Sequence, residues 1–102
     1  MNRLVEENRA PLEEICRRRH VRQIELFGSA TGENFDPATS DLDFLVTFAE
    51  IPLGNYADAY FGLLEDLQDL FHRPVDVVVE SSIRNPYFRQ SVNSTRMLVY
   101  AA

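Results

Sequence analysis

The sequence contains no lysine, no tryptophan, a single cysteine and no long apolar run. Without lysine, arginine carries all of the permanent positive side-chain charge, and the net charge is −6. Proteins that bind nucleic acid through its phosphates depend on clustered lysine and arginine, so direct nucleic-acid binding is not expected. The lone Cys16 cannot form a disulfide within the chain. No segment approaches the roughly 20 apolar residues of a membrane span.

The residues that are present form a composition typical of a folded domain. The chain is 45% hydrophobic and 11% aromatic, which argues against disorder. A chain of 102 residues can bury one core, so we expect residues 1–102 to form a single domain. The first residues lack the apolar segment of a secretory signal. A cytoplasmic protein without membrane association is therefore expected.

Apolar spacing in the first half predicts a helix followed by two strands. Pro11 and the apolar residues after it predict a helix over residues 11–20, with a helical turn before it. Alternating apolar residues predict a strand over residues 21–27. Residues 32–40 are rich in turn formers, and a second strand is predicted over residues 41–48.

The second half begins with the strongest helical pattern in the chain. Asn55 is the expected N-cap of a helix over residues 56–71. A short valine-rich strand is predicted over residues 75–80, and a polar helix over residues 85–93. Residues 97–100 fit an edge strand, and continuation of the helix is the alternative.

These elements define the expected fold. The first two strands must run antiparallel if their facing ends serve one site, and the helix that follows favours a parallel second pair through a crossover. We therefore predict an α/β fold with a mixed three-to-four-stranded sheet and helices packed chiefly on one face.

Five residues stand out as candidates for chemistry. Gly28 and Ser29 end the first predicted strand, where a glycine lets the backbone approach phosphate groups. Asp41 and Asp43 are two residues apart on the second strand and point to one face, as metal ligands would. Asp76 lies among valines, an unfavourable place for a carboxylate without a function. A carboxylate pair alone arises by chance in so acidic a chain. The combination of the Gly-Ser pair, the two spaced aspartates and a later aspartate among valines does not.

Together these residues suggest nucleotidyl transfer. Two carboxylates can hold one or two Mg²⁺ ions against a polyphosphate. A third carboxylate can complete a second metal site or accept the proton of an attacking hydroxyl.

The chain resembles the minimal nucleotidyltransferases of the DNA polymerase β superfamily. The resemblance rests on Leu-Phe-Gly-Ser-Ala from residue 26, Ser-Asp-Leu-Asp-Phe-Leu-Val from residue 40 and Val-Asp-Val-Val from residue 75. It implies that Gly28 and Ser29 contact the phosphates of ATP, and that Asp41, Asp43 and Asp76 form the catalytic and Mg²⁺-binding set. Many members of this family are antitoxins paired with a HEPN-domain ribonuclease toxin, and some transfer AMP to a tyrosine of that toxin.

One departure leaves other functions open. Members of the family usually carry an arginine soon after the Gly-Ser pair, whereas this chain has Ala-Thr-Gly-Glu. Arg84, Arg89 and Arg96 are the candidates to replace it. The alternatives are a binding-only antitoxin that acts by occlusion, an enzyme acting on a small molecule or nucleic-acid end, and a metal-free interaction domain. A homo- or hetero-oligomer is compatible with each.

Overall fold

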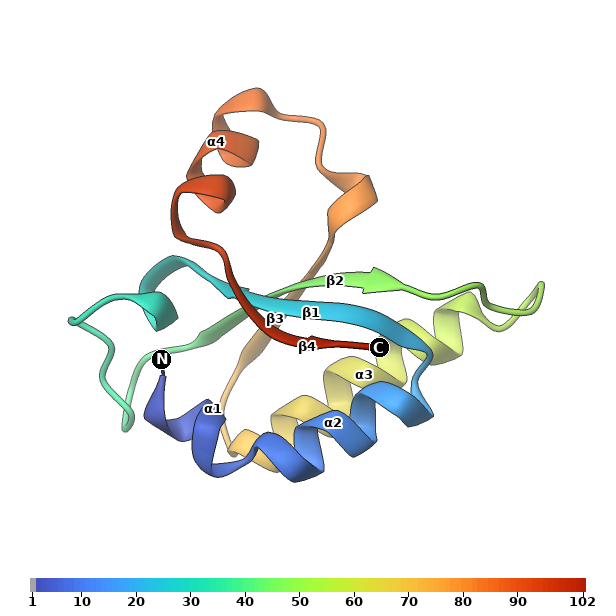
Figure 1. Ribbon diagram of the computed structural model, residues 1–102, viewed down its shortest axis with the longest axis horizontal. Helices are drawn as coiled ribbons and strands as arrows, with labels where there is room; N and C mark the ends of the chain where they lie inside the picture. Colours follow the sequence, from blue (N-terminus) through green and yellow to red (C-terminus); the bar gives the residue numbers. More distant parts are fainter. Residues whose placement is uncertain (1) are drawn as a thin grey trace.

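The computed structural model describes residues 2–102, and its centre is one mixed sheet. The strands lie in the order β3-β2-β1-β4 (Figure 1). Their bounds are β1 (Val21–Phe27), β2 (Leu42–Phe48), β3 (Val75–Val79) and β4 (Met97–Ala101). β1 runs antiparallel to β2 and β4, and β2 runs parallel to β3. The predicted mixed α/β sheet and the predicted edge strand at the end of the chain are confirmed.

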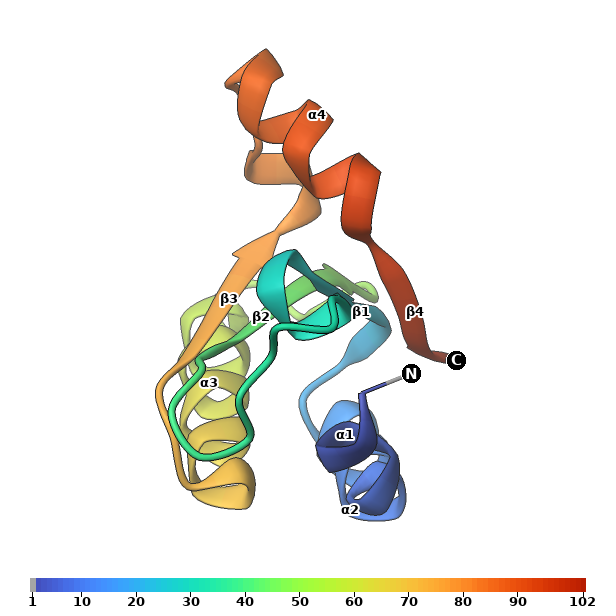
Figure 2. The same ribbon diagram turned by 90° about the vertical axis from the view of Figure 1, so that its left-hand side faces the viewer.

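The helices lie chiefly on one face of this sheet, as predicted. Figure 2 shows α1 (Arg3–Glu7), α2 (Arg9–Arg18) and α3 (Tyr56–Phe71) below the strands, and α4 (Pro86–Thr95) on the opposite side. Because α3 connects the parallel strands β2 and β3, it forms the predicted crossover.

Side-chain alternation along β1 divides the core into two parts. Ile24 and Leu26 are fully buried on the face that carries α2 and α3, where they join a cluster with Leu63 and Leu67 of α3. Burying each of these side chains contributes about 1.5–3 kcal/mol. A smaller cluster on the other face consists of Phe27, Leu45 and Val92. The smaller cluster holds α4 over the end of the sheet where β1 stops.

The structure refines several local predictions. Asn55 is the N-cap residue of α3, as predicted, but its backbone (φ −102°, ψ 2°) is not extended and its side chain makes no capping hydrogen bond. β3 ends at Val79, since Glu80 begins the short 3₁₀ helix Glu80–Ser82. β2 begins at Leu42, which leaves Asp41 just outside the strand. Within residues 2–102, no helix has the length and apolar character needed to cross a membrane.

Candidate active site

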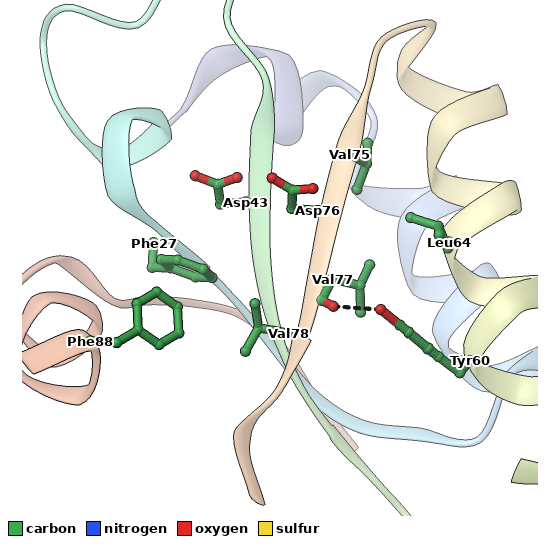
Figure 3. A pocket seen from close by; sticks show the side chains of 9 residues that line it. All are labelled: Phe27, Asp43, Tyr60, Leu64, Val75, Asp76, Val77, Val78 and Phe88. Atoms are coloured by element: carbon green, nitrogen blue, oxygen red, sulfur yellow. Dashed lines mark hydrogen bonds between the residues drawn. The ribbon is translucent and has the colours of Figure 1, made fainter. Parts of the chain in front are cut away.

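Two of the three predicted carboxylates lie side by side. Asp43 of β2 and Asp76 of β3 are register partners in the parallel pair, and their side chains point to the same face (Figure 3). Asp43 is half-buried, whereas Asp76 is exposed. Burial, followed by the neighbouring charge of Asp76, raises the pKa of Asp43 to about 6. The pair is therefore a site of concentrated negative potential that a cation would relieve.

The third predicted carboxylate takes a more peripheral position. Asp41 is exposed beside the start of β2, and its charge adds to the raised pKa of Asp43. Among residues 2–102, no three acidic, histidine or cysteine side chains are arranged as a metal site. Mg²⁺ is commonly bound by one or two carboxylates together with substrate phosphates, and it does not require a cage made of protein alone. The oxygen-only set of Asp41, Asp43 and Asp76 fits that kind of binding.

The Gly-Ser turn lies directly beside the carboxylate pair. Phe27, the last residue of β1, is the register partner of Asp43, and Gly28 follows with φ +73°. A Cβ atom at Gly28 would lie 2.9 Å from Oδ2 of Asp43, closer than real Cβ contacts allow. Glycine adopts the positive φ without strain, and its missing Cβ leaves room for the Asp43 carboxylate as it stands. Ser29 is exposed in the 3₁₀ helix η1 (Gly28–Thr31).

A cavity of about 320 Å³ adjoins the carboxylate pair. Its apolar wall includes Phe27 and Phe88, whose rings pack edge to face with centroids 6.0 Å apart. On the β3 side the cavity reaches Tyr60 of α3, whose hydroxyl donates a hydrogen bond to the carbonyl oxygen of Val77 at 2.8 Å (Figure 3). The site therefore combines two carboxylates with an apolar hollow that can accept a flat ring.

The contacts between α4 and the sheet are not predictable from local sequence patterns. Arg96, just after α4, donates two hydrogen bonds to the carboxylate of Glu25, with Nε to Oε2 at 2.6 Å and Nη2 to Oε1 at 3.0 Å. Glu25 is only 6% exposed, and Arg96 holds its pKa below the usual range. Arg96 also pairs with Glu80 at 3.0 Å, and Arg89 pairs with Glu80 at 3.2 Å. Alternation along β1 places Glu25 on this face, but nothing local indicates its partner.

These contacts bear on the arginine that the family motif contains and this chain lacks. Arg89 and Arg96 are held by Glu80 and Glu25, and Arg84 donates to the carbonyl oxygen of Ser81 at 2.8 Å. In this structure, all three candidate replacements therefore make contacts within the protein.

A fourth arginine shapes the loop that leads to Asp41. Arg73 donates hydrogen bonds to the carbonyl oxygens of Ser40, at 3.1 Å, and of Pro37. Its guanidinium also lies 5.8 Å from the ring centroid of Phe35. Arg73 thus ties the end of α3 to the loop before β2, and this role was not apparent from its sequence position after a helix.

A carboxylate pair beside a glycine turn at one end of a sheet is an arrangement typical of sites for phosphoryl or nucleotidyl transfer. Comparison with known proteins also indicates a nucleotidyltransferase. The chain belongs to the nucleotidyltransferase domain family, whose model matches residues 10–99. The predicted membership of this superfamily is confirmed.

Two related proteins match most of the chain. A protein of Methanocaldococcus jannaschii named as a candidate protein adenylyltransferase is 37% identical over 79 residues, which covers 78% of this chain and 76% of that protein. The structure of a protein named as a candidate minimal nucleotidyltransferase matches with a TM-score of 0.70 and 29% identity, covering 91% of this chain and 90% of the other.

A third similarity shows the shared fold. The protein is also similar to a chain in the structure of a tri-AMPylated HEPN toxin of Shewanella oneidensis in complex with an MNT antitoxin. The TM-score is 0.64 at 20% identity, and the match covers 95% of this chain and 72% of that one.

Proposed function

We propose that this protein is a Mg²⁺-dependent adenylyltransferase that transfers AMP from ATP to a tyrosine hydroxyl of a partner HEPN-type toxin. The observation that carries the proposal is the Asp43–Asp76 pair beside Gly28, where an added Cβ would meet the Asp43 carboxylate. In this reading the protein acts as an antitoxin in the cytoplasm.

The chain's own residues divide the work of the reaction. The Gly28–Ser29 turn receives the outer phosphates of ATP, with Ser29 in contact and Gly28 allowing the close approach, and the apolar wall formed by Phe27 and Phe88 receives the adenine ring. Asp76 accepts the proton of the attacking tyrosine hydroxyl. The hydroxyl oxygen forms a bond to the α-phosphorus, the bond to the bridging oxygen breaks, and pyrophosphate leaves.

The carboxylate set fits a divalent cation. Asp41, Asp43 and Asp76 would hold Mg²⁺, and the ion would neutralise phosphate charge and stabilise the leaving pyrophosphate. The raised pKa of Asp43 supports this assignment, because it reports crowded negative charge at the site.

Two observations support a protein as the acceptor. A protein with this fold occurs in complex with an AMPylated HEPN toxin. The net charge of −6 also favours a basic partner over a nucleic acid. An open site at one end of a small sheet leaves room for a loop of another protein to present its hydroxyl.

A binding-only antitoxin is the second candidate, and the engaged arginines favour it. Arg89 and Arg96 are paired with the carboxylates of Glu80 and Glu25, and these ion pairs compete with any contact to a nucleotide phosphate. Such a protein would neutralise its toxin by covering it.

Co-expression separates the two functions. The toxin is produced with wild type, Asp43→Asn or Asp76→Asn, and with Asp69→Asn as a control that changes an exposed carboxylate on α3. We expect intact mass spectrometry to show AMP on a toxin tyrosine with wild type and Asp69→Asn only, and toxicity to return with the site variants. Full neutralisation by Asp43→Asn and Asp76→Asn, without AMP on the toxin, would establish occlusion.

A further inference from the structure

Gly28 is held from both sides by threonine hydroxyls. Its N–H donates a hydrogen bond to Oγ1 of Thr95 at 2.8 Å, and its carbonyl oxygen accepts one from Oγ1 of Thr31 at 2.9 Å. Thr31 is a local partner within the same 3₁₀ turn. Thr95 is 67 residues away in the chain and is the last residue of α4. The position of the turn therefore depends on a helix from the other end of the sequence.

Thr95 stands in a well-anchored part of α4. Val92, one turn earlier, is 1% exposed and packs with Phe27 and Leu45 of the sheet. Arg96, the next residue, is fixed by its two hydrogen bonds to the buried carboxylate of Glu25. Because α4 is anchored on both sides of Thr95, the Thr95 hydroxyl has a fixed position from which it accepts the hydrogen bond of the turn.

The precision of this contact matters because of what lies beside Gly28. A Cβ atom added at Gly28 would lie 2.9 Å from Oδ2 of Asp43, so the turn passes close to the carboxylate. The Thr95 bond ties the turn to α4 in this position close to the carboxylate. The same bond fixes the place of Ser29, the next residue, whose side chain is exposed at the start of the turn.

We infer that Thr95 is a positioning residue for nucleotide binding, which sets the distance between the Gly28–Ser29 turn and the Asp43 carboxylate. This inference rests on the proposed function, since it assumes that the turn receives the phosphates of ATP. Displacing a binding turn by a fraction of an ångström weakens every contact that depends on its geometry.

Three variants test the role of Thr95. Thr95→Val keeps the shape of the side chain and removes the hydroxyl, whereas Thr95→Ser keeps the hydroxyl. Ser94→Ala is the control, because Ser94 is an exposed neighbour whose hydroxyl bonds only within α4, to the carbonyl oxygen of Ser91. We expect Thr95→Val to weaken binding of a non-hydrolysable ATP analogue with Mg²⁺ about tenfold by calorimetry. Thr95→Ser and Ser94→Ala should stay within about twofold of wild type.

A second measurement ties the effect to Gly28 itself. In the nucleotide-free protein, hydrogen exchange of the Gly28 amide should become faster in Thr95→Val and remain slow in Thr95→Ser. Unchanged analogue affinity in Thr95→Val would overturn the inference, as would equal weakening in Thr95→Ser, or a wild type that does not bind the analogue. A wild type that binds the analogue but transfers no AMP would defeat the proposed function and leave the role of Thr95 in binding intact.

Discussion

The carboxyl groups of Asp43 and Asp76 lie at paired positions of two parallel strands, where partial burial and the charge of Asp76 raise the pKa of Asp43 to about 6. A sheet stabilised by its own packing would gain from apolar residues at both positions. The protein instead retains two like charges side by side. Repulsion between these charges opposes folding in the absence of a cation. The free energy of unfolding therefore reports on the pair.

The raised pKa gives Asp43 a distinct effect on stability as pH changes. Its ordinary pKa is 3.8, so between about pH 4 and pH 6 the folded protein binds more protons at Asp43 than the unfolded chain does. The contribution of Asp43 to the free energy of unfolding therefore falls as pH rises through this window. The full shift corresponds to about 3 kcal/mol, which partial exposure reduces to about 1–2 kcal/mol.

Urea unfolding with EDTA measures this contribution by comparing wild type with Asp43→Asn. The two proteins should differ little at pH 4, and the variant should be more stable by about 1–2 kcal/mol at pH 7. Glu25 and Asp66, whose pKa values are lowered by Arg96 and by Arg19, change both proteins equally at low pH. A stability difference that does not change between pH 4 and pH 7 would refute the raised pKa.

Magnesium should reverse the order of stability of these two proteins. With MgATP, wild type should gain several degrees in Tm because the bound ion offsets the repulsion at the carboxylate pair. Asp43→Asn should lose most of that gain, whereas Asp69→Asn, altered at an exposed position on α3, should retain it. Differential scanning fluorimetry at a fixed ATP concentration provides the measurement. Equal shifts in wild type and Asp43→Asn would remove Asp43 from the set of metal ligands.

Much of the fold and the central part of the site could be predicted from the sequence. Alternation along residues 21–27 and 41–48 indicates two strands, and a full helix before the strand predicted over residues 75–80 favours a parallel crossover. These patterns are local, and they suffice to bring Asp43 and Asp76 to the same end of the sheet.

The contacts made by α4 could not be predicted in this way. Glu25 and Arg96 are 71 residues apart, and Gly28 and Thr95 are 67 apart. Both pairs join elements that come together where Val92 and Phe88 pack α4 onto the face of the sheet opposite α3. A glutamate in the middle of a strand, such as Glu25, is predicted to be exposed to solvent when its partner is unknown. No local pattern indicates that Arg96, which follows a helix far along the chain, is that partner.

The ion pair between the buried Glu25 and the partly buried Arg96 should show strong coupling. Arg96→Leu leaves the carboxylate of Glu25 without its main partner at 6% exposure, and we expect it to cost about 2–4 kcal/mol. The double variant Glu25→Leu/Arg96→Leu should recover at least half of that loss, because no unpaired charge remains in the interface under α4. A double-mutant cycle by chemical unfolding measures the coupling. If the stability losses of the two single variants simply add in the double variant, Glu25 and Arg96 have no interaction energy.

Gly28 should be sensitive to substitution for two separable reasons, and the chain provides a control for one of them. Gly28 and Gly54 both have positive φ, +73° and +88°, so alanine is strained at either position. An added Cβ at Gly54 meets nothing within 4 Å, whereas one at Gly28 meets Oδ2 of Asp43 at 2.9 Å.

We therefore expect Gly54→Ala to cost about 1 kcal/mol and Gly28→Ala to cost about 2–3 kcal/mol by urea unfolding. In an Asp43→Ala background the carboxylate is gone, and the cost of Gly28→Ala should fall to that of Gly54→Ala. This fall would demonstrate that the turn and the carboxylate are in contact in solution, because strain at φ alone does not depend on residue 43. An unchanged cost of Gly28→Ala in the Asp43→Ala background would separate the turn from Asp43 and remove the central geometric support for the proposed site.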